Sequence, residues 1–406
     1  MELLTRPFLP TYLMLALLPI TTHSFSNTSL SNKHPHTKTN QMMQYQRILV
    51  GLAVATALFS SCQNTEDINN NPSPNLPATP YNYANVSYPA HIQQAIDALD
   101  NTPANNTLTD AGATLGRVLF FDNNLSLNNR VSCASCHRSQ NGFSDDRPLS
   151  RGFDGEDTRR HSMTTLNARF YKSGKFFWDE RAASLEEQVL MPIQDHIEMG
   201  MDLADLVAKL RGVDYYPALF EDAFGSSTIT EEGISKALAQ YLRSMVTYQS
   251  KYDLVQQGAA SFTAQELAGQ QLFARRGPNG QLSCQDCHGG STTDIHSTHL
   301  HMGQVATRVR PHDPTDLGVY ETTNNPDDRD KFKVGTLRNI VDQAPYLHDG
   351  SAPTLQALLE SNEHNFGLNP TEITQVIAYL NTLTDEAIQR EEKFSNPFPN
   401  NGRGPR

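Results

Sequence analysis

The sequence lacks several features that would have fixed its class at once. Its two apolar runs near the amino terminus, 8–20 and 48–59, are shorter than the ~20 residues that a membrane-spanning helix needs. Strand signals are few, and there is a single Trp. Positive charge is also scarce, with 32 Lys and Arg against 44 Asp and Glu and a formal net charge of −12. This balance argues against nucleic acid and anionic membrane surfaces as partners.

Cysteine is scarce too, but its placement is informative. Four of the five cysteines stand in two copies of one pattern, Cys133-Ala-Ser-Cys136-His137 and Cys284-Gln-Asp-Cys287-His288. Cys-x-x-Cys-His is the attachment signal of a c-type haem, in which the thiols bind the vinyl groups and the adjacent imidazole ligates the iron. A redox Cys-x-x-Cys or half of a zinc site is the alternative, but neither explains two copies that both end in His. The sequence therefore predicts two covalently bound haems.

The amino terminus and the remaining Cys62 predict export, because c-type haems are attached outside the cytoplasm. Residues 1–61 form a signal region in which Arg47, the apolar run 48–59 and small residues before Cys62 resemble a bacterial lipoprotein signal. A plain signal peptide with an incidental Cys is the alternative. We expect translation to start at Met42 or Met43. The expected location is the periplasm or cell envelope, with membrane attachment only through a lipid on Cys62.

The rest of the chain shows helical patterns. Residues 62–90, rich in Asn, Pro, Ser and Thr, are predicted to be a linker. Apolar periodicity and capping residues predict helices at 91–99, 109–121, 184–193, 203–211, 217–224, 231–245, 263–275, 354–360 and 371–383. In the third of these, Ser184 and Glu187 form a capping box, and Pro192 should end or kink the helix. The predicted fold is all-α, with two tandem cytochrome c-like haem domains at 91–248 and 249–406.

Further motifs lie between and after the two Cys-x-x-Cys-His patterns. They are Thr164-Thr-Leu-Asn167-Ala, Phe177-Trp178-Asp179-Glu180-Arg181-Ala182, Glu187-Gln188, Ile197-Glu198-Met199-Gly200, Lys333-Val-Gly-Thr-Leu-Arg-Asn339 and Pro345-Tyr-Leu-His348-Asp-Gly350. In order and spacing they resemble the bacterial dihaem cytochrome c peroxidase family, which includes the MauG-type enzymes. The resemblance covers about 95–385. It implies an enzyme that reduces hydrogen peroxide to water with electrons from a small donor cytochrome or cupredoxin.

The resemblance also implies roles for individual residues. The haem on His137 would be the peroxidatic one, and the haem on His288 would receive electrons. Trp178 matches the family's aromatic residue between the haems, although a single Trp is more often core packing. Gln188 and Glu198 match the active-site amide and carboxylate. The carboxylate would carry a proton between the two oxygens of the peroxide, and the amide would orient them.

The family resemblance further implies a calcium ion, and the family is often dimeric. Asn167 would give its side-chain oxygen to the calcium, and Gln343 and Pro345 would give backbone carbonyls. A Thr is common at the position of Gln343, but a carbonyl ligand tolerates that change. A homodimer is expected from the family alone, since no interface signal stands in the sequence.

One departure from the family concerns the first haem. Typical relatives place a His in a loop after the first motif, where it ligates the resting iron. Here the loop reads Arg151-Gly152-Phe153-Asp154, and Phe cannot ligate iron. The sequence thus predicts an open sixth position that reacts with peroxide without prior reduction of the other haem. His161, where the family usually has Asn, is the nearest alternative ligand.

Another departure concerns the sixth ligand of the second haem. The family places Met or Tyr in the helix after His-Asp-Gly, but here neither is present and the chain has no Met after Met302. Direct counting lands on Asn362, and a shift of two residues lands on His364, which we predict because imidazole is the better ligand. Met302 and the cluster of His296, His299 and His301 are the rivals. Ligation by two His would lower the potential of this haem relative to His-Met.

Three functions remain open on the sequence. A cytochrome c peroxidase is the leading hypothesis. A MauG-type oxidase that modifies a protein side chain is favoured by the open first haem and disfavoured by the absent Tyr. A dihaem electron carrier without catalysis would have no use for Gln188 and Glu198.

Overall fold

The computed structural model describes residues 72–171, 173–277, 282–289, 307–308, 314–361, 364 and 367–399. They belong to one compact unit, Asn69–Arg406. Several predicted features lie outside the described residues, namely the signal region with Met42 and Met43, Cys62, the candidate ligands His296, His299, His301 and Met302, and Asn362. No helix within the described ranges has both the length and the apolar character needed to cross a bilayer.

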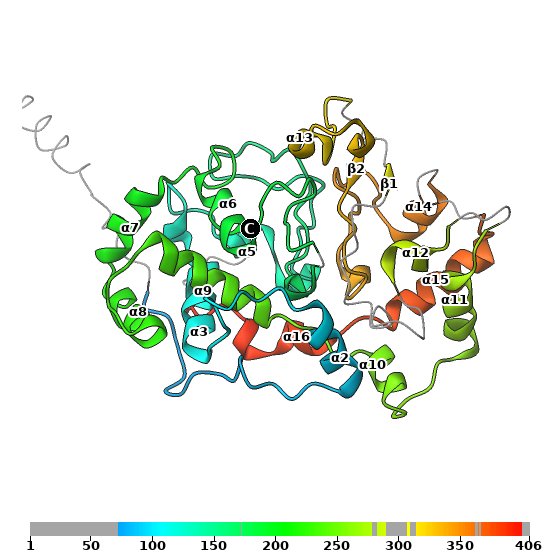
Figure 1. Cartoon of the computed structure of the whole chain (residues 1–406), viewed down its shortest axis with the longest axis horizontal. Helices are drawn as coiled ribbons and strands as arrows, with labels where there is room; N and C mark the ends of the chain where they lie inside the picture. The colour runs from blue at the N-terminus through cyan, green and yellow to red at the C-terminus, as the bar shows by residue number, and fades with distance from the viewer. Residues whose placement is uncertain are drawn as a thin grey trace, which may run out of the picture. The chain divides into compact units, whose positions relative to one another are not determined.

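Helices make up almost all regular structure in the described ranges, as predicted (Figure 1). The α-helices are α2 (Ala90–Leu99), α3 (Asp110–Phe121), α4 (Cys133–Cys136), α5 (Leu185–Gln188), α6 (Met191–Gln194), α7 (Leu203–Arg211), α8 (Tyr216–Phe224), α9 (Glu231–Ser244), α10 (Lys251–Gln256), α11 (Ala264–Ala274), α12 (Cys284–His288), α13 (Tyr320–Thr323), α14 (Leu355–Glu360), α15 (Pro370–Asn381) and α16 (Glu386–Arg390). Short 3₁₀ helices are η1 (Asn123–Leu125), η2 (Ser139–Asn141), η3 (Ala168–Phe170), η6 (Pro326–Asp328), η7 (Ile340–Asp342) and η8 (Glu392–Phe394). Two strands, β1 (Thr307–Arg308) and β2 (Lys331–Phe332), pair antiparallel with Thr307 opposite Phe332.

Side-chain caps fix where the predicted helices begin. Thr230 accepts from the backbone N–H of Gly233 at the start of α9, and Thr263 forms a capping box with Glu266 at the start of α11. The helix predicted at 184–193 is instead two short helices, because α5 ends at Gln188 and α6 begins at Met191. Pro192 therefore starts a helix rather than ending one, since a first-turn Pro has no hydrogen bond to lose.

The same close helix pair occurs twice. In the larger hydrophobic core, here called the first core, α3 packs along α9 (Figure 1). In a smaller hydrophobic core, here called the second core, α11 packs along α15. A glycine permits the approach each time. A Cβ on Gly116 would lie 2.0 Å from the carbonyl oxygen of Ala237, and one on Gly269 would lie 1.9 Å from that of Gln375. Each pair thus brings two helix backbones together beside one Cys-x-x-Cys-His motif.

We expect Gly269→Ala to destabilise the protein because the new methyl would force α11 away from α15. Overpacking of this kind costs about 1–3 kcal/mol, to be measured as the change in free energy of unfolding in urea. Gly212→Ala is the matched control, since a Cβ there would lie 3.4 Å from the nearest atom, the carbonyl oxygen of Lys209, which is an ordinary contact distance. Equal losses in the two variants would contradict the close approach.

The two ends of the described chain both pack on the first core. Tyr83, from the stretch predicted to be a linker, is 1% exposed, and its hydroxyl donates to the carbonyl of Lys393. Ile388 and Phe394, assigned by sequence to the second domain, belong to the first core instead. Their apolar side chains complete a surface that α3 and α9 leave uncovered. The stretch predicted to be the second domain, 249–406, therefore contributes two side chains to the first core.

Candidate functional site

The first Cys-x-x-Cys-His motif forms a single capped helical turn. Ser132 and Ser135 cap α4 reciprocally, which sets Cys133 and Cys136 three residues apart on one face. His137 follows directly, and its Nδ1 lies 3.2 Å from the carbonyl oxygen of Phe143. Because a carbonyl only accepts, Nδ1 carries the proton and Nε2 keeps the lone pair that a metal requires.

The thiols have the character of buried neutral groups. Burial raises the pKa of Cys133 and of Cys136 to about 12, and that of Cys284 to about 11. Such thiols are protonated at neutral pH, unlike those of a redox Cys-x-x-Cys. Within the described ranges no three His, Cys, Asp or Glu side chains converge to hold a metal ion, as a zinc site would require. The motifs fit covalent attachment to a large apolar group better than either alternative.

A cavity of about 430 Å³ opens beside this motif. Apolar side chains, among them Phe120, Leu238 and Leu242, form part of its wall next to the two Cys residues and His137. Three predicted catalytic residues line it as well, namely Trp178, Gln188 and Glu198. The residues therefore fit a haem held by His137, with an amide and a carboxylate in the same cavity. We call this space the first cavity.

Glu198 has an environment suited to proton transfer. Burial raises the pKa of its carboxyl to about 7, the nearby Asp195 carboxylate adds to the shift, and Arg181 opposes it. The backbone is held in place, because the N–H of Glu198 donates to Asp195 Oδ1 at 3.1 Å. A carboxyl with a pKa near neutrality can both take and give a proton at physiological pH.

The loop containing Phe153 supports the Glu198 segment. The backbone N–H of Phe153 donates to the carbonyl of Glu198 at 3.0 Å, and the Phe153 ring fills the space where a Cβ on Gly200 would stand. Gly152 lies so close to Ile197 that a Cβ there would be 1.7 Å from its carbonyl oxygen. The loop thus packs against the chain on either side of Glu198.

The second motif repeats the local design of the first. Ser283 and Asp286 form a capping box at the start of α12, which carries Cys284, Cys287 and His288. A second cavity of about 180 Å³ is lined by these three residues together with His364 and His348. Its apolar wall is supplied by α11, α14 and α15, through residues that include Phe273, Leu355, Leu359, Val376 and Leu380. The residues of this second cavity also suit a haem held by His288, and the predicted ligand His364 lies on its wall.

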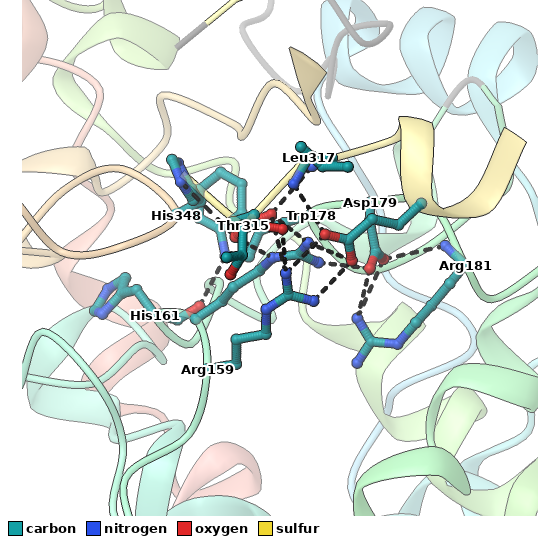
Figure 2. Close-up of polar contacts among 12 residues, drawn as sticks. Arg159, His161, Trp178, Asp179, Arg181, Thr315, Leu317 and His348 are labelled. Carbon is teal, nitrogen blue, oxygen red and sulfur yellow. Dashed lines mark hydrogen bonds and ion pairs between the residues drawn. The ribbon is translucent and has the colours of Figure 1, made fainter. Parts of the chain in front are cut away.

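Trp178 lines both cavities. Its indole N–H donates to the carbonyl of His161 at 2.7 Å, and the N–H of His161 donates to the carbonyl of His348 at 2.7 Å. Figure 2 shows Trp178 among the polar contacts that also include His161 and His348. The ring centroids of Trp178 and His348 are 6.4 Å apart in an edge-to-face arrangement. The indole is therefore held by a hydrogen bond at a place where it lines both cavities.

A buried charge cluster holds the residue next to Trp178, and the sequence did not reveal it. The guanidinium of Arg160 contacts Asp179 at 2.5 Å and both carboxylate oxygens of Asp316 at 2.7 and 2.9 Å. Burial alone would raise the pKa of Asp316, but the hydrogen bonds from Arg160 outweigh it and lower that pKa. Arg159 and Arg181 extend the cluster (Figure 2). Asp316 stands in a loop without a motif, 156 residues after Arg160, so no local signal marked the pair.

Glu180, two residues after Trp178, has a backbone conformation that is uncommon for a residue with a side chain. Its φ of 56° lies in the left-handed region that favours glycine. Its side chain accepts from Ser173 at 2.9 Å. Burial lowers the pKa of the nearby Lys333 well below its usual range, and the Glu180 carboxylate opposes that shift. The carboxylate thus partly compensates an ammonium group that lies 3.0 Å from the centre of the Tyr171 ring.

Two residues considered as metal ligands, His161 and Asn167, make hydrogen bonds within the protein. Both ring nitrogens of His161 are engaged, Nε2 with Ser144 at 3.1 Å and Nδ1 with the carbonyl of Arg147 at 3.0 Å. His161 therefore positions the chain between the cavities instead of offering a ligand. Asn167 Oδ1 accepts from the N–H of Thr247 at 3.0 Å.

The other two residues predicted to bind calcium, Gln343 and Pro345, lie on the wall of the second cavity. The side-chain amide of Gln343 donates to the carbonyl of Arg338 at 2.9 Å. Calcium binding remains a prediction.

Comparison with known proteins identifies the family. The family model for di-haem cytochrome c peroxidase matches residues 110–261. Cytochrome c551 peroxidase of Nitrosomonas europaea is 34% identical over 300 residues, which cover 72% of this chain and 85% of that protein. The chain belongs to the dihaem cytochrome c peroxidase family. The methylamine utilization protein MauG of Methylorubrum extorquens is 31% identical over 302 residues, 70% of this chain and 81% of that protein.

A solved structure agrees with this assignment. A MauG-like protein associated with microbial copper homeostasis superposes with a TM-score of 0.66 at 28% identity, covering 77% of this chain and 99% of that one. Membership of a dihaem family thus explains the two Cys-x-x-Cys-His motifs. The further iron ligands must be inferred from the residues of this chain.

Proposed function

We propose that this protein is a cytochrome c peroxidase with two tandem c-type haems, one in each cavity. Hydrogen peroxide would be reduced to water in the first cavity with electrons that enter through the second. The observation that carries the proposal is the meeting of His137, Gln188 and Glu198 in one cavity that Trp178 joins to another. Peroxidases among the relatives, such as that of Nitrosomonas europaea, support it.

Each of the predicted catalytic side chains in the first cavity would have a separate role. Bound haem would supply the iron at which peroxide takes up two electrons. Glu198 accepts the proton from the near oxygen of peroxide and returns it to the far oxygen, which then leaves as water. Gln188 orients the peroxide by hydrogen bonding, and Trp178 provides an aromatic path from the second cavity. Two electrons, two protons and one peroxide thus give two waters.

The same residues support the predicted iron ligands. The first iron would keep an open sixth position, because Phe153 packs on Gly200 and the ring of His161 is engaged by Ser144 and Arg147. The second iron would be ligated by His288 and His364, which line one cavity. A protein with this arrangement would react with peroxide without prior reduction.

The test is stopped-flow mixing of the oxidised holoprotein with peroxide, together with an electron paramagnetic resonance spectrum of the resting state. We expect one high-spin and one low-spin ferric signal, and a fast absorbance change on mixing. His364→Ala should convert the low-spin signal to high spin and leave the first signal unchanged. Two low-spin signals with no reaction toward peroxide would contradict the proposal.

A MauG-type oxidase is the second candidate. Relatives named MauG at 29% and 31% identity and the open first position favour it. It requires a protein substrate, so peroxide-dependent modification of a co-purifying protein would distinguish it from the peroxidase. A pure electron carrier would consume no peroxide in the presence of a reduced cytochrome.

The proposal also covers the location of the enzyme, its electron donor, its oligomeric state and its calcium ion. Export to the periplasm or cell envelope and a lipid on Cys62 would suit covalent haem attachment. A small cytochrome or cupredoxin would be the donor, and a homodimer is expected from the family. A calcium ion at Asn167, Gln343 and Pro345 would require Asn167 Oδ1 to use its second lone pair. Metal analysis of the purified protein tests whether this calcium ion is bound.

A further inference from the structure

Trp178 lines both cavities, and three other segments of the chain hold it there. Its indole N–H donates to the carbonyl of His161, and its own carbonyl accepts from the backbone N–H of Lys333 at 2.9 Å. Its ring stands edge-on to that of His348 (Figure 2). The His348 ring in turn stacks on Phe332, with 3.6 Å between centroids and 13° between planes. An electron that passes through Trp178 therefore depends on how closely these segments approach one another.

One buried side chain, that of Arg160, connects these segments. It donates to Asp179, the residue after Trp178, at 2.5 Å. It also donates to both carboxylate oxygens of Asp316, at 2.7 and 2.9 Å. Asp316 Oδ2 lies 4.0 Å from Nε2 of His348. Arg160 thus joins the residue beside Trp178 to a residue beside His348. We call the contacts of Arg160 with Asp179 and Asp316 the Arg160 bridge.

The neighbouring arginines each contact one of the two bridged carboxylates. Arg181 contacts Asp179 at 3.1 Å, and Arg159 lies 3.8 Å from Asp316. The side chain of Arg159 is 49% exposed, whereas that of Arg160 is 8% exposed. Exposed ion pairs are weak, but a buried, planar guanidinium can hold two carboxylates in fixed positions. Arg160 is therefore the side chain whose removal would free the two segments from each other.

We propose that Arg160 is a positioning residue that sets the rate of electron transfer between the two haems by holding Trp178 and His348 in contact. The role rests on the proposed function, which puts one haem in each cavity. In the step concerned, the second haem loses one electron and the first haem gains it, and no bond is made or broken. Loss of the Arg160 bridge lets the indole and the imidazole separate. Electron transfer then slows, because its rate falls steeply with the distance between the groups that carry the electron.

Two substitutions distinguish positioning from an effect of charge, because they remove charges of opposite sign. Arg160→Gln removes a positive charge from the bridge, and Asp316→Asn removes a negative one. If the bridge acted through its charge on the haem potentials, the two variants would change the rate in opposite directions. A positioning role predicts that both variants slow the transfer severalfold. Arg160→Lys should also stay slow, since it keeps the charge but loses the planar fork that contacts both carboxylates.

The rate is measured by stopped-flow mixing of the fully reduced holoprotein with one equivalent of peroxide. Peroxide takes two electrons at the first haem in the early phase, and one electron then passes from the second haem to the first. The rate constant of the later absorbance change, that of the second haem, is compared between variants.

Arg243→Gln is the matched control, because it also breaks a buried pair. Arg243 is 2% exposed and contacts both carboxylate oxygens of Glu186, at 2.5 and 3.0 Å. Among the described residues it lines neither cavity. This variant should keep the native rate constant of the later phase, even where it lowers stability.

A second measurement does not depend on turnover. Trp178 is the single Trp of the chain, so ultraviolet resonance Raman spectroscopy of the holoprotein reports on its indole alone. The band that senses the indole N–H hydrogen bond should shift in Arg160→Gln and in Asp316→Asn. The reason is that the acceptor, the carbonyl of His161, belongs to the residue directly after Arg160. The band should keep its position in the control variant.

Rate changes of opposite sign, native rates in both variants, a native rate in Arg160→Lys, or an unshifted indole band in both variants would each overturn the role of Arg160. In each of these cases a normal reaction of the native first haem with peroxide would leave the proposed function standing. Absence of that reaction in the native protein would instead overturn the proposed function, and the indole band would then decide whether Arg160 holds Trp178.

Discussion

Replacement of Glu198 by Gln should slow the reaction with hydrogen peroxide by about 10²–10⁴-fold, the range expected when a positioned acid–base group is lost. The amide keeps the shape of the carboxyl but cannot take the proton from the near oxygen of peroxide. Stopped-flow spectroscopy of the first haem measures the rate constant. Glu187→Gln is the matched control, because Glu187 is exposed and its carboxylate accepts from the N–H of Ala183 instead of lining the first cavity.

The pH dependence should change with the same substitution. Glu198 must be ionised to accept a proton, and its pKa is raised to about 7. The rate constant of the native protein should therefore decline as pH falls below about 7 and level off above it. The Gln variant should be slow at every pH. A variant that keeps the native profile would assign the ionisation to another group.

Glu198→Gln should raise the stability of the protein at neutral pH although it lowers the activity. The carboxyl pKa is raised from 4.5 in the unfolded chain, so the folded protein retains a proton that the unfolded chain releases between about pH 4.5 and 7. The contribution of Glu198 to stability therefore falls as pH rises through that window. Above it, Glu198→Gln should raise the free energy of unfolding by about 1–3 kcal/mol. A slower yet more stable variant would separate a catalytic loss from a folding defect.

Replacement of Asp253 by Asn should destabilise the protein by about 3–5 kcal/mol, because it leaves a buried guanidinium without its counter-charge. Arg338 contacts the two carboxylate oxygens of Asp253 at 2.6 and 2.8 Å, and both side chains are completely buried. Urea unfolding of the apoprotein and holoprotein measures the loss. The exposed pair of Glu386 and Arg390 provides the control, since Arg390→Gln should change stability by no more than about 0.5 kcal/mol.

Acid should act on the same pair. Burial alone would raise the pKa of Asp253, but Arg338 and the hydrogen bonds from His91 and Ser250 lower it far below its usual range. The stability that Asp253 contributes is therefore present above about pH 4 and is lost as pH falls further. The native protein should lose stability more steeply in acid than Asp253→Asn. Parallel acid titrations of the two proteins would contradict this coupling.

The sequence predicted the parts of this protein that are encoded locally. Thr230 and Thr263 mark helix starts because a cap needs only the next three residues, and the two Cys-x-x-Cys-His motifs are each complete within five. Glu198 and Gln188 were predicted from family resemblance, and they do line one cavity with His137. Pro192 was misjudged because its effect depends on whether it falls in the first turn of a helix or later.

What the sequence could not predict depends on contacts between distant segments. Arg160 and Asp316 are 156 residues apart, and neither stands in a pattern that requires the other. Tyr83 lies in a stretch whose Asn, Pro and Ser content is typical of linkers, and only the tertiary structure buries its ring. Likewise, Ile388 and Phe394 follow the second motif in the chain but complete the apolar surface of the first core.

The closure of the first core by Tyr83 and Lys393, 310 residues apart, has a consequence for how the protein matures. Contacts between such distant residues form late, because a long loop must be ordered first. The second core draws its residues from one continuous stretch, Tyr252 to Leu383, and can assemble without waiting for either terminus. Maturation should thus run against the direction of synthesis, with the half made last becoming native before the half made first.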